Sequence, residues 1–83
     1  MKIGGKLLKV LNKKYVPKDI IHQKFEQYDI TFKTDEHGNP ILLFIGNRKE
    51  DGMIRGEYFS RVLIREKNGE VVKDHWDCKG KIS

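Results

Sequence analysis

Aromatic and arginine side chains in the second half of this 83-residue chain are the groups whose chemistry best suits binding. Aromatic rings on a sheet can stack on nucleobases, and cationic side chains can pair with phosphate. Placing predicted strands side by side brings six such groups to one face: Lys33, Phe44, Phe59, Arg61, Arg65 and Trp76. This pattern predicts a face that binds RNA, single-stranded DNA or another polyanion.

The N-terminal third carries the excess positive charge. The formal net charge is +5, and seven lysines but one acid lie in residues 1–24. Lys6, Lys9 and Lys13 fall on one side of a predicted helix, where they could follow a phosphate backbone. We include them in the predicted binding site, and the alternative is an ordinary solvated helix face. The helix is short and lacks Trp and Phe, so we expect no membrane binding.

The sequence gives little support for a metal site, a cofactor or a catalytic centre. His75 and Asp77 share a face of a predicted strand next to Cys78, but no metal-ligand spacing surrounds them. No phosphate-binding loop or dinucleotide fingerprint occurs. A lone cysteine permits no intrachain disulfide, and no apolar segment is long enough for a signal peptide or a membrane span. We therefore expect a cytoplasmic protein without a cofactor.

A run of five apolar residues, Ile41 to Ile45, predicts a strand buried on both faces. Period-two patterns predict strands over residues 29–34, 40–49, 53–67 and 70–78. The dipeptides His37-Gly38, Asp51-Gly52 and Asn68-Gly69 predict two-residue hairpin loops between them. Gly56 predicts a bulge or bend. These features indicate a four-stranded antiparallel meander.

Two short helices are predicted ahead of the meander. Leu7, Leu11 and Tyr15 show helical spacing over residues 6–15, although a strand there stays an alternative. Pro17 ends this helix and opens a second one that reaches about residue 27. The prediction is a single α+β domain: residues 1–5 frayed, 6–27 helical, 28–78 a β-meander with one face packed by helix, and 79–83 a polar tail.

Two-residue loops fix the expected register and faces. Arg61 then lies opposite Trp76, and Phe59 lies opposite both Phe44 and Cys78, on the predicted binding face. Phe32 lies opposite Leu43 on the other face, which is the predicted core: Ile30, Phe32, Ile41, Leu43, Ile45, Tyr58, Val62, Ile64, Val71 and His75. A one-residue change in a loop would exchange the faces beyond it.

The predicted binding face has alternative interpretations. The first helix could cover it, with Arg61 stacked over Trp76 and paired with Asp74, or two copies of the chain could meet there. The function expected is a non-enzymatic binding module, and the alternative is a structural or homo-oligomeric interaction domain.

A third interpretation is a small ribonuclease. Tyr58, Arg61, Arg55 and His75 could supply charge and proton transfer for phosphodiester cleavage. In gross layout, basic helices followed by an antiparallel sheet, the chain resembles bacterial mRNA-cleaving toxins. It lacks their leading strand, and none of their motifs can be matched residue by residue.

Overall fold

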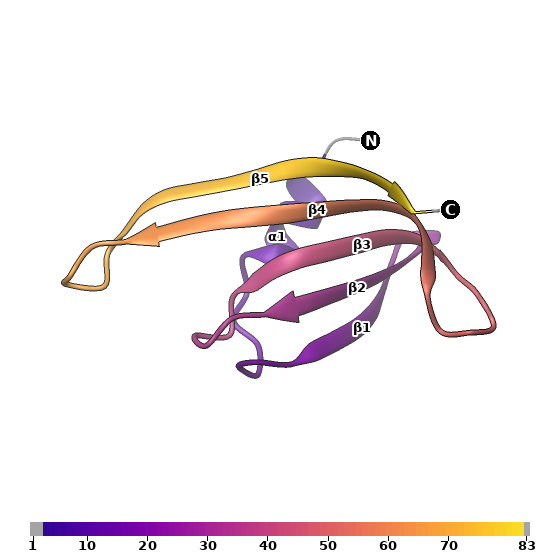
Figure 1. The fold of residues 1–83 in the computed structure, drawn as a ribbon, viewed down its shortest axis with the longest axis horizontal. Coiled ribbons are helices and arrows are strands. Elements are labelled where there is room, and N and C mark those ends of the chain that lie inside the picture. The colour runs from indigo at the N-terminus through magenta and orange to yellow at the C-terminus, as the bar shows by residue number, and fades with distance from the viewer. Residues whose placement is uncertain (1–2, 83) are drawn as a thin grey trace.

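The computed structural model describes residues 3–82, which form one helix and five strands (Figure 1). The elements are α1 (Gly5–Leu11), β1 (Ile20–Phe25), β2 (Tyr28–Thr34), β3 (Pro40–Arg48), β4 (Ile54–Arg65) and β5 (Val71–Ile82). Each strand pairs antiparallel with the next, in the order β1-β2-β3-β4-β5. The predicted fold of two helices and four strands is therefore wrong, since a single helix precedes a five-stranded sheet.

The predicted second helix is strand β1. Its residues pair with β2 from Ile20 opposite Lys33 to Phe25 opposite Tyr28. Residues 20 and 21 are β-branched, which favours a strand, and so short an apolar run fits either period. The turn between the strands contains Glu26 with φ +54°, a conformation that glycine usually supplies. The sequence therefore carries no turn signature at this hairpin.

The segment between α1 and β1 folds back onto the sheet. Thr34 Oγ1 donates to the Val16 carbonyl at 2.7 Å and accepts from the Asp19 N–H at 2.9 Å. The Tyr15 hydroxyl donates to the Val10 carbonyl at 2.7 Å, and its ring centroid lies 4.8 Å from that of Phe32. Burial raises the Tyr15 pKa. The first helix therefore ends at Leu11 instead of continuing to residue 15.

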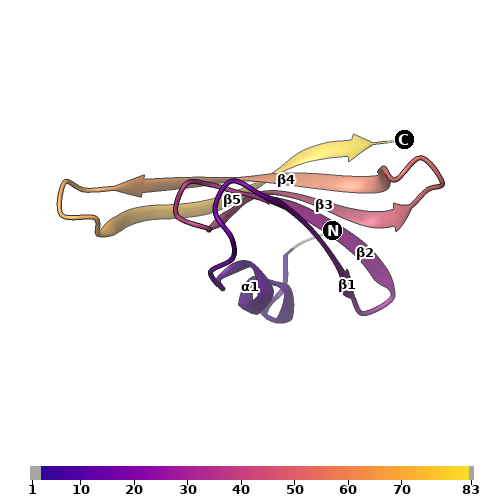
Figure 2. The ribbon, with the colours of Figure 1, turned by 90° about the horizontal axis from the view of Figure 1, so that it is seen from below.

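The core lies between α1 and one face of the sheet, as Figure 2 shows. Two helix residues, Leu7 and Leu11, are buried against apolar side chains of β2, β3 and β4: Ile30, Phe32, Leu43, Ile45 and Phe59. Within residues 3–82, no element lies on the opposite side of the sheet, which we call the open face (Figure 2). Its residues include Ile20, His22, Thr31, Lys33, Phe44, Tyr58, Val62 and Ile64.

All three long hairpins have three-residue loops instead of the predicted two-residue ones. The loops end in Gly38, Gly52 and Gly69, which have φ of +82°, +84° and +86°. Each glycine N–H donates to the carbonyl three residues earlier, and the flanking residues also bond to each other. The Asp-Gly and Asn-Gly signatures do not separate these two loop lengths, because a positive-φ glycine suits both.

The extra loop residue changes the sheet faces at one hairpin only. Irregularities after Lys33 and Ile64 restore the predicted register, so Phe32 lies opposite Leu43 and Arg61 lies opposite Trp76 as expected. The β3–β4 hairpin has no such irregularity, and Leu43 lies opposite Phe59. The predicted faces are therefore wrong beyond β3, because a slip of one residue reverses every side chain.

The ends of the sheet also differ from prediction. Strand β5 continues to Ile82, so residues 79–82 are not a polar tail. Gly46 lies opposite Gly56, and a Cβ on either would lie 2.1 Å from a backbone oxygen of the other strand. The pairing of β3 with β4 is continuous through Gly56, so no bulge lies there in this pair, and Figure 1 shows the hairpin bending toward its loop. Gly4 is the N-cap of α1 and Gly5 is its first residue, and the prediction for residues 1–2 and 83 lies outside the described residues.

Candidate binding face

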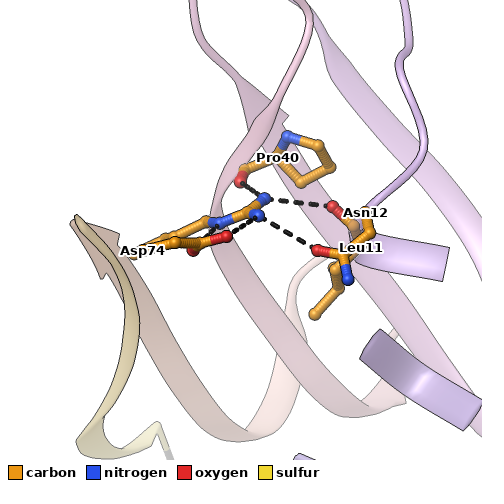
Figure 3. Close-up of polar contacts among 5 residues, drawn as sticks. Leu11, Asn12, Pro40 and Asp74 are labelled. Atoms are coloured by element: carbon orange, nitrogen blue, oxygen red, sulfur yellow. Dashed lines mark hydrogen bonds and ion pairs between the residues drawn. The ribbon is translucent and has the colours of Figure 1, made fainter. Parts of the chain in front are cut away.

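Arg61, a predicted ligand contact, joins α1 to the sheet (Figure 3). Its Nε and Nη2 donate to the two carboxylate oxygens of Asp74, each at 2.7 Å. Nη1 donates to the carbonyls of Leu11 and Pro40 at 3.1 Å, and Nη2 also donates to Asn12 Oδ1 at 3.0 Å. All five N–H groups of the guanidinium are used, and only 6% of the side chain is exposed. This geometry gives Arg61 a structural role at the end of the helix.

Trp76 lies beneath the same guanidinium. The Arg61 Cζ is 5.4 Å from the centre of the Trp76 ring, within the range of a cation–π contact. The hydrogen bonds from Arg61 hold the pKa of the Asp74 carboxyl below its ordinary value. This arrangement matches the alternative in which the helix covers the Arg61 face.

The predicted binding residues are divided among three parts of the molecule. Phe59 is 3% exposed beneath α1, beside Arg61 and Trp76. Arg65 lies at the end of β4, where its Nη1 donates to the Gly69 carbonyl at 3.1 Å. The three N-terminal lysines are exposed on or just after α1: Lys6, Lys9 and Lys13. Of the predicted set, Phe44 and Lys33 share the open face.

The open face carries an apolar stripe that the predicted register concealed. At its centre the rings of Phe44 and Tyr58 stack, with centroids 5.9 Å apart and planes 22° apart. On the same face, Ile20 and Met53 line a groove with Phe44, and Val62 and Ile64 continue the apolar side chains along β4; all four are between 38% and 54% exposed. Exposed apolar groups gathered on one face are typical of interaction surfaces.

A groove of about 280 Å³ hollows this face next to the β3–β4 loop. Its lining is mostly apolar and contains no acidic residue: Ile20, His22, Thr31, Lys33, Phe44, Gly52, Met53, Ile54 and Ile82. Among the described residues none forms a hydrogen bond or ion pair with Lys33 Nζ or His22 Nε2. The groove therefore combines an apolar interior with two nitrogens that could receive an anionic group.

Arg48 fixes the wall of the groove. Its Nη1 donates to the Gly52 carbonyl at 3.2 Å, and its Nη2 donates to Thr31 Oγ1 at 3.1 Å. That hydroxyl also lies 2.9 Å from His22 Nδ1. Asp29 accepts the Arg48 backbone N–H at 2.8 Å, and this bond lowers the Asp29 pKa. Sequence reasoning missed these polar residues, because they converge only once β1 and the loop are placed.

The residues considered for catalysis or metal binding do not form a site. His75 Nε2 lies 2.7 Å from Asp77 Oδ1 on an exposed part of β5. Within residues 3–82 no cluster of three or more His, Cys, Asp or Glu could hold a metal. In the ribonuclease interpretation, Tyr58 and His75 lie on the open face, whereas Arg61 lies under α1. The fourth member, Arg55, pairs with Asp51 in the loop at 3.3 Å.

Comparison of the chain with protein-family models, with curated proteins and with solved structures finds no match. A membrane-spanning helix is not found in the described part of the chain. A functional assignment therefore has to be argued from the open face itself.

Proposed function

We propose that this protein is a non-catalytic protein-interaction module that binds its partner on the open face. The observation that supports the proposal is the uncovered apolar stripe around the Phe44–Tyr58 ring pair. A domain of this size has only marginal stability, so a large apolar surface left in water is best explained by a partner that covers it.

The composition of the open face supports a protein partner. Interfaces are enriched in aromatic residues, Met and Arg, and their central residues lie within a polar rim. Phe44, Tyr58 and Met53 provide the apolar centre here, while Lys33 and Lys24 lie toward the β1 side of the sheet. A second copy of the chain is one partner of this kind.

The proposal is tested by selecting random peptides displayed on phage against the folded protein. Peptides with a shared sequence pattern are expected, and their binding is expected to be lost in the Ile20→Lys variant. Val72→Lys is the matched control, because both side chains are 54% exposed but lie at opposite edges of the sheet. If peptides with a shared sequence pattern bind the Ile20→Lys variant as tightly as they bind the native protein, the proposal is contradicted. A selection that yields no shared pattern also contradicts it.

Single-stranded nucleic acid is the second candidate. It is favoured by the absence of acids from the groove lining, which places Phe44 beside Lys33. The test is the anisotropy of a labelled mixed-sequence oligonucleotide at low and high salt. Binding that weakens with salt and is lost in Lys33→Glu supports this candidate. Intrinsic fluorescence is a poor reporter here, because Trp76 lies on the α1 side of the sheet.

A homodimer is examined by light scattering over a range of protein concentrations. A mass that rises to that of two chains and falls back in Ile64→Lys would identify the second copy as partner.

A cytoplasmic location is part of the same proposal, supported by Cys78 being the one cysteine of the chain.

A further inference from the structure

The two edges of the sheet differ in how open they are to a further strand. The β5 edge carries many charged or ionisable side chains, and its pairing with β4 is irregular at two places. These side chains are Lys73, Asp74, His75, Asp77, Lys79 and Lys81. Charges and irregularities of this kind discourage pairing with another chain. The β1 edge has six residues in continuous register, with Lys24 as its single Lys, Arg, Asp or Glu.

The backbone of β1 presents free hydrogen-bonding groups at two residues. In an antiparallel pair, residues alternate between bonding to the neighbouring strand and pointing away from it. The Thr34 N–H donates to the Asp19 carbonyl at 2.9 Å, and the two-residue turn closes at Phe25 opposite Tyr28. The odd-numbered residues of β1 therefore bond to β2. His22 and Lys24 point their N–H and C=O groups outward, while the Ile20 N–H is bonded to Asp19 Oδ1 at 2.8 Å.

The residues with free backbone groups are also next to the groove. His22 lines it, and Lys24 lies on the same face two residues further along β1. A strand added beyond β1 would therefore place every second side chain on the open face, beside the groove. An apolar side chain there would meet Ile20, and an acidic one would lie on the same face as Lys33.

A second copy of β1 is a poor occupant of this edge. Antiparallel pairing of β1 with itself about a twofold axis opposes His22 to its own copy. The same pairing brings Lys24 and Lys33 of both copies to one side of the sheet. In this register each Lys24 lies opposite Ile20 of the other copy, so the pairing creates no new ion pair between the two chains. Lys24 is already paired with Asp29 at 3.0 Å, whereas Lys33 forms no ion pair with the described residues. Lys33 is therefore the cation that favours an acidic residue in the partner segment.

We infer that the partner contributes an extended segment of apolar and acidic residues, which adds to the sheet as a strand along β1. This inference rests on the proposed function and specifies the partner and its mode of binding. Main-chain hydrogen bonds to His22 and Lys24 would supply affinity, and side chains at the groove would supply specificity.

The probe is a blocked seven-residue peptide of threonines, with phenylalanine at its third position and glutamate at its fifth. These two side chains share a face of a strand, and a second peptide with their order reversed covers the opposite strand direction. Binding is followed by NMR of the isotope-labelled protein. The amides of His22 and Lys24 are expected to become protected from exchange with solvent. Those of Ile21 and Gln23, already bonded to β2, serve as internal controls.

The matched control peptide for antiparallel pairing carries N-methyl groups on the phenylalanine and the glutamate, whose N–H groups would then face β1. For parallel pairing the N-methyl groups are on the fourth and sixth residues instead, because the residues on either side of the glutamate then face β1. Each control keeps every side chain but cannot pair, so its binding is expected to weaken at least tenfold. Replacing the glutamate by lysine is expected to weaken binding about two- to fivefold, the size typical of an exposed ion pair. Lys33→Glu should weaken the parent peptide similarly, whereas Lys79→Glu on the β5 edge should leave its binding unchanged.

Three outcomes would overturn the inference. Equal binding of the methylated peptide, without protection of His22 and Lys24, excludes strand addition. If that binding is still lost in Ile20→Lys, the proposed function stands. Failure of both peptide orders to bind removes the inference, and the phage selection then tests the proposed function independently. A dimer that dissociates in Ile20→Lys assigns the β1 edge to a second copy.

Discussion

The two faces of the sheet are built from similar residues but have opposite surroundings. On the α1 side, Phe32 and Leu43 are fully buried, whereas on the open face Phe44 is half-buried and Ile20 is mostly exposed. Each face also has one arginine that ties another segment to the sheet. Arg61 holds the end of α1, and Arg48 holds the β3–β4 loop.

The two faces therefore differ less in their residue types than in whether another element covers them. The seven-residue helix covers the middle of one face of the sheet, and the β4–β5 hairpin projects beyond it (Figure 2). The apolar residues of the covered face therefore contribute to stability, and those of the open face are available for binding. Four experiments, three of them on paired substitutions, test this division in order of decreasing effect.

Phe32→Ala and Phe44→Ala compare the two faces directly. Phe32→Ala should reduce the free energy of unfolding by about 3–5 kcal/mol, because it empties a site in the core. Phe44→Ala should cost about 1–2 kcal/mol, because its ring is already partly exposed. Urea denaturation followed by circular dichroism measures both. Equal losses would mean that the open face is packed as tightly as the core.

Arg61→Met and Arg48→Met compare the two arginines that hold another segment against the sheet. Arg61→Met should cost about 3 kcal/mol, since it leaves Asp74 and two backbone carbonyls without their donor. Arg48→Met should cost about 1 kcal/mol, because its contacts lie nearer to solvent. Amide exchange is expected to speed up in α1 for the first variant and in the β3–β4 loop for the second. Faster exchange in the same segment for both would argue against separate roles.

Gly38→Ala and Gly52→Ala compare two loops of the same conformation. Both glycines have positive φ, so alanine at either should cost roughly 1 kcal/mol from backbone strain. At Gly38 the new Cβ would also lie 2.2 Å from the Tyr15 carbonyl oxygen, whereas Gly52 faces open space. The Gly38 variant should therefore have the clearly lower melting temperature. Matching temperatures would mean that the segment before β1 is only loosely held.

Asp74→Asn tests the charge that supports Arg61. The folded state lowers the Asp74 pKa, so the stability it provides is present above the ordinary carboxyl pKa near 4 and is lost as the pH falls below it. The variant should lose less than about 1 kcal/mol at neutral pH, because Asp74 is partly exposed. Its stability should also fall less steeply with acid. Urea denaturation at neutral pH and at a pH below about 4 measures both effects. If the loss of stability with acid is as steep in the variant as in the native protein, the acid sensitivity belongs to Asp29 and Asp35, whose pKa values are also lowered.

The four later strands could be predicted from the sequence, because their residues alternate or, in β3, form a continuous apolar run, and because glycine marks each turn between them. The helix around Leu7 and Leu11 was also predictable, and so was Arg61 opposite Trp76. Strand β1 was not, because its turn uses Glu26 in a conformation that the sequence does not signal. A six-residue strand between polar segments then resembles a short amphipathic helix.

The site was less predictable than the fold. Phe44 and Lys33 share one face as expected, and their role in binding stays a prediction, but Phe59, Arg61 and Trp76 lie on the covered side. This error came from a single loop residue, since loops of two and three residues carry the same glycine signature. His22 also lines the groove, and nothing in the linear sequence indicates that His22 lies near Phe44.

The length of the β3–β4 loop determines which side chains of β4 and β5 lie on each face of the sheet. Deleting one of its three residues, Glu50 for instance, would turn β4 and β5 over together. Arg61 would then lie on the open side, where it cannot reach the end of α1. Insertions and deletions of one residue should therefore be tolerated poorly here. At the other two long hairpins, a one-residue length change could be absorbed by the neighbouring irregularity. During divergence of such a chain, the length of this loop should be retained more strictly than its residue types.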